Sequence, residues 1–268
     1  MPEKLLILGG TREAYELAEC LVSQFSPEQL TVISSLAGVT EHPRQPAGEV
    51  RIGGFSDTNG TGGKSGLQNY LLQEKISLLV NATHPYAAQI SENALAAATE
   101  LQIPFLRVTR PPWVKQPGDQ WIEVPDMEAA ANYLIDYKTI SQNELYKHSV
   151  FLTIGNRGLS IFRKCNKNRF FVRTVDPPPE EALSWSEAIF MEGRGPFTLE
   201  NELALFRQNA ITILITKNSG GISTYAKIEA ARKLYVPVIM VARPASSLKE
   251  IYPTIDDSTD WITKNILS

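Results

Sequence analysis

Two adjacent glycines followed by a hydroxyl residue give the amino-terminal part of the chain its clearest chemical signal. The residues are Gly9, Gly10, Thr11 and Arg12. Glycines let the backbone turn tightly and let a ligand come close. The hydroxyl of Thr11 can cap a following helix, whose amino end carries partial positive charge. Together these features are typical of a turn that binds the phosphates of a nucleotide, and we expect all four residues to contact a cofactor.

The residues on either side of this turn supply the strand and helix that it needs. Residues 4–8 end in an unbroken apolar run, which predicts a strand buried on both faces of a parallel sheet. Apolar residues then recur at spacings of three and four, which predicts a helix over residues 12–25. The full G-x-G-x-x-G pattern is absent because Ala14 takes the place of the third glycine. A tight turn that binds nothing is therefore the alternative.

The end of the second expected strand, residues 30–34, bears on the choice of cofactor. An acidic residue at this point usually binds the ribose hydroxyls of NAD. This strand instead ends in Ser34 and Ser35, with no Asp or Glu. The pattern favours NADP over NAD and places Ser35 near the adenosine ribose. The nearest cations in the sequence are Arg12 and Arg44.

The alternation of strand and helix continues along the whole chain and predicts an α/β protein with parallel sheets. Further strands are expected at residues 49–53, 76–81, 103–108, 149–154, 170–175, 188–191, 211–216 and 236–241. Further helices are expected at residues 67–73, 87–100, 127–137, 199–208 and 225–234. The segment TNGTGGKSG, residues 58–66, contains GGKS but lacks the first glycine of a P-loop, so we expect a surface insertion.

The second half of the chain resembles the first. Residues 76–85 resemble residues 211–220, and residues 103–108 resemble residues 236–241. A proline-rich stretch, residues 110–118, separates the halves. We therefore predict two Rossmann-like parallel-sheet domains, residues 1–112 and 113–268, with a cleft between them. The end segment from residue 246 could pack on either half.

Composition excludes several classes of protein. The net charge of −3 gives no basic surplus for nucleic acid. The two cysteines, Cys20 and Cys165, suggest neither disulfides nor a metal site. We see no signal peptide and no apolar run of the ~20 residues that a membrane helix needs. A cytoplasmic protein without membrane partners is expected.

Several loops together resemble one known family. ILGGTREA, SLAGVT, VRIGGF, NATHPYAAQIS, GPFTLENE and TKNSGG stand in the order found in the precorrin-6A reductase family of cobalamin biosynthesis, which includes cobalt-precorrin-6A reductases. The resemblance runs from residue 5 to about residue 244. It implies a two-domain Rossmann-like fold and reduction of a tetrapyrrole double bond with NADPH, or with NADH as the alternative. Val39 stands where many members carry arginine.

The tetrapyrrole that the resemblance implies carries many carboxylates, so its site should be cationic. Cations at expected strand ends are Arg107, Arg110, Arg157, Arg194, Lys217 and Arg243. We favour Lys217 for substrate binding and catalysis because it lies in the TKNSGG loop of the resemblance. Arg157, Arg194 and Arg243 are further candidates for the substrate carboxylates. Asn218, Ser219 and Gly220 could donate hydrogen bonds to the same groups.

A second loop, with Thr83, His84 and Pro85, should border the cofactor or the cleft. An imidazole titrates near neutrality, so His84 could donate the proton that accompanies the hydride. It could equally cap the helix that follows. No Ser-His-Asp order or carboxylate pair is evident, so hydrolysis is not indicated.

Without the resemblance, the residues indicate only a two-domain α/β protein that binds a nucleotide. A two-domain nucleotide-sugar transferase and a non-enzymatic NADP-sensing protein are the alternatives. We expect a monomer or a weak homo-oligomer. The presence of cobalt in the substrate stays open.

Overall fold

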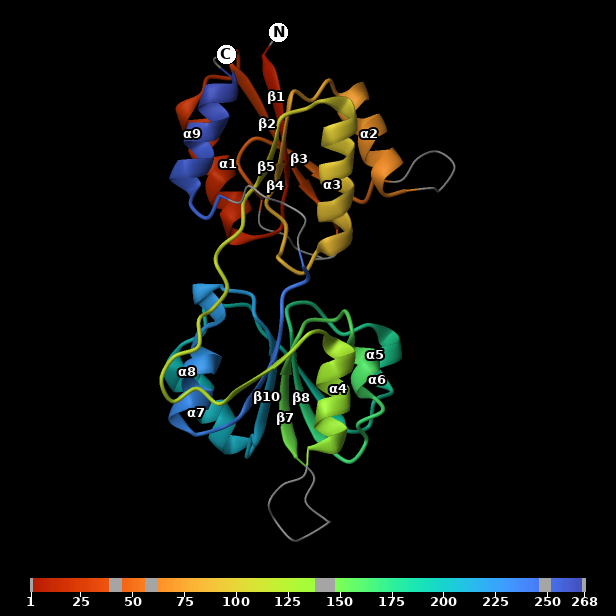
Figure 1. Cartoon of the computed structure of the whole chain (residues 1–268), viewed down its shortest axis with the longest axis vertical. Coiled ribbons are helices and arrows are strands. Elements are labelled where there is room, and N and C mark those ends of the chain that lie inside the picture. The colour runs from red at the N-terminus through yellow and green to blue at the C-terminus, as the bar shows by residue number, and fades with distance from the viewer. Residues whose placement is uncertain (1, 39–44, 56–61, 138–147, 246–251, 267–268) are drawn as a thin grey trace. The chain divides into compact units, whose positions relative to one another are not determined.

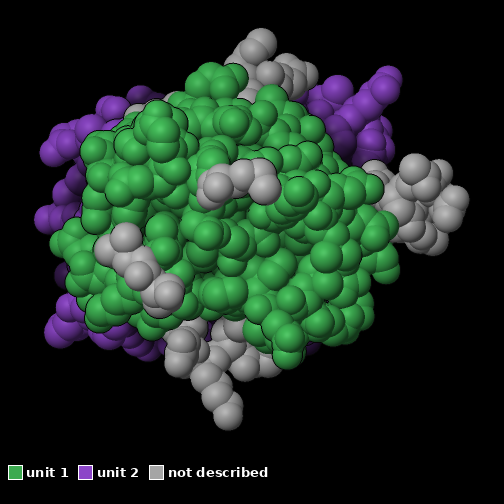
Figure 2. All heavy atoms as spheres, turned by 90° about the horizontal axis from the view of Figure 1, so that it is seen from above, with its two compact units in different colours: residues 1–111, 245–268 green, residues 112–244 purple. Residues whose placement is uncertain are grey.

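A computed structural model describes residues 2–38, 45–55, 62–137, 148–245 and 252–266. The chain divides into two compact units, coloured separately in Figure 2. Unit 1 comprises residues 1–111 and 245–268, and unit 2 comprises residues 112–244. Among the described residues, no helix combines the length and apolar character needed to cross a membrane.

Unit 1 is built on a parallel five-stranded sheet with the order β3-β2-β1-β4-β5. Its strands are β1 (Glu3–Leu8), β2 (Leu30–Leu36), β3 (Glu49–Ile52), β4 (Leu78–Asn81) and β5 (Phe105–Arg107). Its helices are α1 (Arg12–Gln24), α2 (Lys64–Gln73), α3 (Ala88–Leu101) and α9 (Ile255–Ile266). All strand pairs are parallel, as the near-continuous apolar strands predict.

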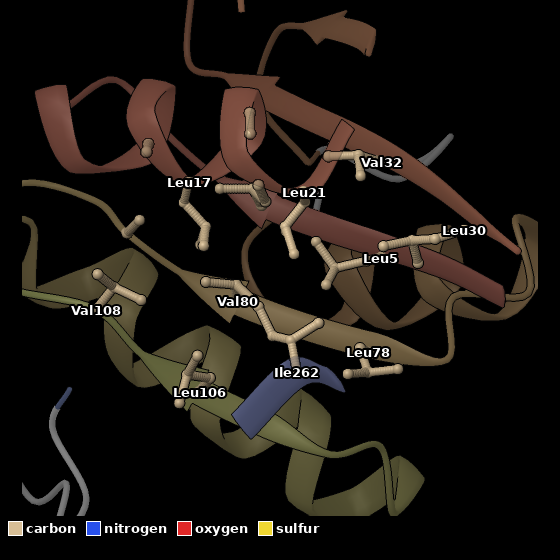
Figure 3. Packing of buried hydrophobic residues seen from close by; sticks show 14 residues of the cluster. Leu5, Leu17, Leu21, Leu30, Val32, Leu78, Val80, Leu106, Val108 and Ile262 are labelled. Carbon is tan, nitrogen blue, oxygen red and sulfur yellow. The ribbon is translucent and has the colours of Figure 1, made fainter. Parts of the chain in front are cut away.

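Alternate residues of β1 face two separate cores. Leu5 packs with Leu17 and Leu21 of α1 and with Ile262 of α9, as Figure 3 shows. Leu6 packs in a second cluster with residues of α2 and α3. Helices therefore cover both faces of the sheet (Figure 1), which explains why β1 has no polar face.

Unit 2 contains a parallel six-stranded sheet with the order β6-β11-β10-β7-β8-β9. Its strands are β6 (Trp121–Val124), β7 (Ser149–Thr153), β8 (Arg169–Thr174), β9 (Ala188–Glu192), β10 (Ile213–Lys217) and β11 (Val238–Val241). Its helical segments are α4 (Met127–Asp136), α5 (Leu159–Phe162), α6 (Glu180–Leu183), α7 (Leu199–Gln208), η1 (Ile222–Thr224) and α8 (Ala226–Lys233). The order from β9 to β11 matches that from β3 to β5 in unit 1, which confirms the predicted repeat.

The chain passes from unit 1 to unit 2 after β5 and returns to unit 1 after β11. The chain leaves β5 of unit 1 and forms β6, which pairs with β11 in unit 2. It leaves β11 and returns to unit 1, where Tyr252 forms a parallel bridge with Val108 just after β5. Strand β6, which follows β5 in the chain, therefore extends the sheet of unit 2 beside β11. The segment at Tyr252, which follows β11 in the chain, pairs in unit 1 just after β5.

Three sequence expectations differ from the structure. The expected second domain extended to residue 268, whereas α9 packs on unit 1 because Ile262 is fully buried in its core. Strand β6 and helix α9 were both missing from the expected elements. The expected surface insertion lies partly outside the described residues, at 56–61, but Lys64, Ser65 and Gly66 form the first turn of α2.

Candidate functional site

The glycine turn lies at the carboxyl end of β1, in the central position of the unit 1 sheet. The backbone N–H of Gly9 donates to the carbonyl of Ser35 on β2, at 2.9 Å. Gly10 has a φ of +100°, a conformation that glycine adopts easily. In the part of the chain that the structure describes, no atom lies within 4 Å of a Cβ built on Gly10, so the backbone there is open. This accessible backbone beside a helix start fits the diphosphate of a dinucleotide.

Thr11 fixes the start of α1. Its hydroxyl accepts from the N–H of Ala14 at 3.3 Å and donates to the carbonyl of Ala82 at 2.6 Å. The first bond is the predicted helix cap, and the second ties the helix to the residue after β4. Thr11 therefore positions the turn through its side chain.

Arg12 extends away from this arrangement. Its guanidinium pairs with Glu16 of the same helix at 2.5 Å, and the side chain is 64% exposed. That pairing raises the pKa of Arg12. A phosphate contact from Arg12 would require the side chain to leave Glu16.

Ser35 lies near the end of β2, next to Arg51, a cation that was not among the residues expected from the sequence. Arg51 of β3 is its direct partner in the sheet register, and the Arg51 Nη1 donates to the Ser35 Oγ at 3.1 Å. The hydroxyl of Ser34 is buried and has no hydrogen-bond partner among the described residues. Arg44 and Val39, which the sequence analysis considered, lie outside the described residues.

Thr83 is held by neighbouring side chains. Its hydroxyl donates to the Asn81 Oδ1 at 2.8 Å and lies 3.1 Å from the Arg107 Nη1. Arg107 is only 5% exposed and also donates to the carbonyl of Thr83. Arg107 thus lies at the end of β5, as expected, and its buried guanidinium supports the loop after β4.

His84 accepts a hydrogen bond in the turn before α3. Its Nδ1 accepts from the N–H of Tyr86 at 3.3 Å. The neutral ring in this arrangement carries its proton on Nε2. The helix cap that the sequence left as the alternative is not formed, because α3 begins after Ala87 with no side-chain cap hydrogen bond.

In unit 2, Lys217 ends β10 at the carboxyl edge of the sheet. Its Nζ donates to the carbonyl of Ile154, which follows β7, at 2.6 Å. Burial, helped by the positive charge of Arg157, lowers the pKa of Lys217 to about 8. A lysine with this pKa can exchange a proton near neutral pH.

The loop after Lys217 is fixed by two contacts. The Asn218 side chain accepts from the N–H of Trp113 at 2.7 Å and donates to its carbonyl at 3.1 Å. Arg243, after β11, donates to the carbonyls of Asn218 and Ser219 at 2.9 and 3.0 Å. Arg243 and Gly220 therefore lie with Lys217 in one group, although the Asn218 amide is already used to hold the chain at Trp113.

The two remaining candidate arginines are exposed at the same sheet edge. Arg157 follows β7, the strand next to β10. Arg194 follows β9, three strands from β10. The next residue, Gly195, lies against η1, because a Cβ there would meet the Ser223 carbonyl at 2.7 Å. The Arg194 loop thus contacts the segment that follows the Lys217 loop.

Sequence reasoning missed charged contacts that form only on folding. Glu13, in the first turn of α1, pairs with Arg110 at 2.7 Å. In unit 2, Arg173 pairs with the buried Glu202 at 2.7 Å. Buried beside them, Lys227 has its pKa lowered to about 7, mainly by loss of water. Among the residues that the structure describes, no group of three or more His, Cys, Asp or Glu is placed to hold a metal ion.

Comparison with known proteins places these features in a family. Residues 4–263 match the family described as precorrin-6x reductase CbiJ/CobK. A precorrin-6A reductase of Rhodococcus erythropolis is 40% identical over 254 residues, covering 95% of this chain and 94% of that protein. A cobalt-precorrin-6A reductase of Synechocystis sp. is 30% identical, covering 98% and 97%. The solved structure of the CobK precorrin-6A reductase has a TM-score of 0.84 and 37% identity, covering 98% of this chain and 97% of that one.

The two parallel sheets and the glycine turn at β1 define an α/β protein of Rossmann-like construction, and its relatives make it an oxidoreductase. Within that class, the chain belongs to the precorrin-6x reductase family. This membership confirms the resemblance seen in the loops of the sequence.

Proposed function

We propose that this chain reduces one double bond of the precorrin-6A macrocycle, giving precorrin-6B in cobalamin biosynthesis, with NADPH as the hydride donor. The observation that carries the proposal is the 40% identity to a precorrin-6A reductase over nearly the whole of both chains. A nucleotide-sugar transferase or a non-enzymatic sensor is not favoured, since the relatives are named as reductases.

Unit 1 supplies the residues suited to the cofactor. The open backbone at Gly10, the adjoining Gly9 and the amino end of α1 would hold the diphosphate, with Thr11 keeping the helix in place. Arg12 could reach the same phosphates by releasing Glu16. Ser35 would lie near the ribose, and Thr83 would border the bound molecule.

Unit 2 supplies the cations suited to the substrate. Lys217 and Arg243 lie together, with Ser219 and Gly220 in the loop between their contacts. Arg157 and Arg194 are exposed at the same edge, where their guanidinium groups could pair with carboxylates. Asn218 contributes by keeping this loop fixed to Trp113.

Reduction of a carbon–carbon double bond needs a hydride on one carbon and a proton on the other. The cofactor supplies the hydride when bound. Lys217 is the better proton donor on electrostatic grounds, because burial lowers its pKa to about 8. His84 is the second candidate, with the proton of its neutral ring on Nε2.

The metal-free substrate is the better match of the two known to the family. The relative named precorrin-6A reductase is 40% identical, and the relative named cobalt-precorrin-6A reductase is 30% identical. We therefore infer that precorrin-6A itself, without cobalt, is the preferred substrate.

The direct test mixes the purified chain with NADPH and either precorrin-6A or its cobalt complex under anaerobic conditions. We expect oxidation of NADPH matched by a product that has gained two hydrogen atoms, and faster turnover of the metal-free compound. Nucleotide oxidation without a reduced macrocycle, or no reaction with either compound, would contradict the proposed function.

A further inference from the structure

One cation of unit 1 is placed at the strand end where the ribose of a dinucleotide would lie. In a sheet of the order 3-2-1-4-5, a dinucleotide held at the β1 turn reaches its ribose toward the end of β2. Ser35 is at that end, and Arg51 is its register partner on β3. The guanidinium is therefore next to the position that distinguishes NADP from NAD.

The guanidinium is held in a fixed orientation by three hydrogen bonds. Its Nη1 donates to the Ser35 Oγ at 3.1 Å and to the Gly53 carbonyl at 2.6 Å. Its Nη2 donates to the Gly54 carbonyl, also at 2.6 Å. The central carbon lies 4.0 Å from the centre of the Phe55 ring and 4.9 Å from that of Tyr70. Two aromatic rings and three acceptors thus fix a planar cation in advance of binding.

The charge of Arg51 has no carboxylate partner among the described residues, in contrast to Arg12 and Arg110. Its three acceptors among the described residues are neutral oxygens, and these bonds do not use the Nε–H or one Nη2–H. No atom of the described residues lies within 4 Å of a Cβ built on Gly53 or Gly54, so none of them covers the backbone there. A half-buried, oriented cation that no described carboxylate neutralises suits a phosphate.

We propose that Arg51, with the hydroxyl of Ser35, forms the 2′-phosphate site and sets a preference for NADPH over NADH. The inference rests on the proposed function, since it assumes that the nucleotide occupies the β1 turn. It assigns the selectivity to a residue on β3, in place of the expected cations Arg12 and Arg44.

The test measures dissociation constants for NADPH, NADH and 2′,5′-ADP by isothermal titration calorimetry, without any tetrapyrrole. Arg51→Gln should weaken NADPH and 2′,5′-ADP by about tenfold or more, as expected for loss of a charge-assisted hydrogen bond. It should leave NADH within about twofold of the unchanged protein, because NADH lacks the 2′-phosphate. Arg51→Lys keeps the charge and should retain part of the preference.

Lys4→Gln is the matched control. It removes one positive charge from the same unit, but at the amino end of β1, where Lys4 pairs with Glu74. It should change neither nucleotide. Thermal unfolding of each variant shows whether the fold is intact.

Two results would overturn the inference. Equal weakening of NADPH and NADH in Arg51→Gln would mean that Arg51 only supports the loop at Gly53 and Gly54. An unchanged NADPH affinity would mean that the 2′-phosphate lies elsewhere. Failure of the unchanged protein to bind either nucleotide would instead contradict the proposed cofactor, and the inference with it.

Discussion

Lys217 combines a position at a strand end with a charge that is poorly hydrated. Its pKa is lowered to about 8, mainly by burial and to a smaller extent by the charge of Arg157. A bound carboxylate would raise that pKa again, because opposite charges stabilise each other. Substrate binding and protonation of Lys217 should therefore be coupled.

This coupling predicts a pH dependence of substrate binding. The affinity for precorrin-6A should be constant below the pKa of about 8 and should fall above it, by at most about tenfold per pH unit, as the lysine loses its proton. Lys217→Met should bind weakly at all pH values. Lys217→Arg stays charged and should bind without this pH dependence. Titrations of macrocycle absorbance at several pH values provide the measurement, and a wild-type affinity that is flat in pH would argue against the contact.

At the scale of residues, the sequence predicted the glycine turn after β1 better than it predicted the contacts of the residues around that turn. Gly9, Gly10 and Thr11 are adjacent in the chain, so their spacing alone indicated a tight turn and a helix cap. Arg51 and Ser35 are sixteen residues apart and meet only because β2 and β3 pair in one particular register. The burial of Arg107, a cation expected at a strand end, depends on the folded loop around Thr83 and could not be predicted.

At the scale of elements, α1 links the glycine turn to β4. The hydroxyl of Thr11 both caps the helix and donates to the carbonyl of Ala82. We predict that Thr11→Ala lowers the free energy of unfolding by about 1–2 kcal/mol through loss of the cap. Thr11→Ser keeps the hydroxyl and should lose less. Urea denaturation of both variants checks this, and equal destabilisation by the two substitutions would show that the hydroxyl contributes little.

The elements that the sequence missed have weak local signals. Strand β6 contains four residues, of which Trp121 and Val124 are the buried pair. Its place in the sheet depends on β11, far along the chain. Helix α9 has mostly polar residues in its first two turns, so its apolar face is short. Longer elements such as α1 and β1 were predictable because their apolar spacing repeats several times.

At the scale of the whole molecule, the last segment contributes to the core of unit 1. Ile262 is fully buried among residues of β1, β4 and α1 (Figure 3). We predict that Ile262→Ala lowers the free energy of unfolding by about 2–4 kcal/mol because it leaves a cavity. Lys264→Ala, at an exposed position on the same helix, should have little effect. Chemical denaturation tests both, and similar stability of the two variants would contradict the assigned packing.

Because unit 1 contains both ends of the chain, the two units can finish folding at different times during protein synthesis. The first 111 residues leave the ribosome early. Val108 and the core around Leu17 gain their contacts with residues 252–266 only after those residues have been synthesised. Unit 2 is continuous in sequence and can close as soon as β11 has emerged. The amino-terminal unit is therefore completed last, so an interrupted synthesis leaves its apolar face uncovered.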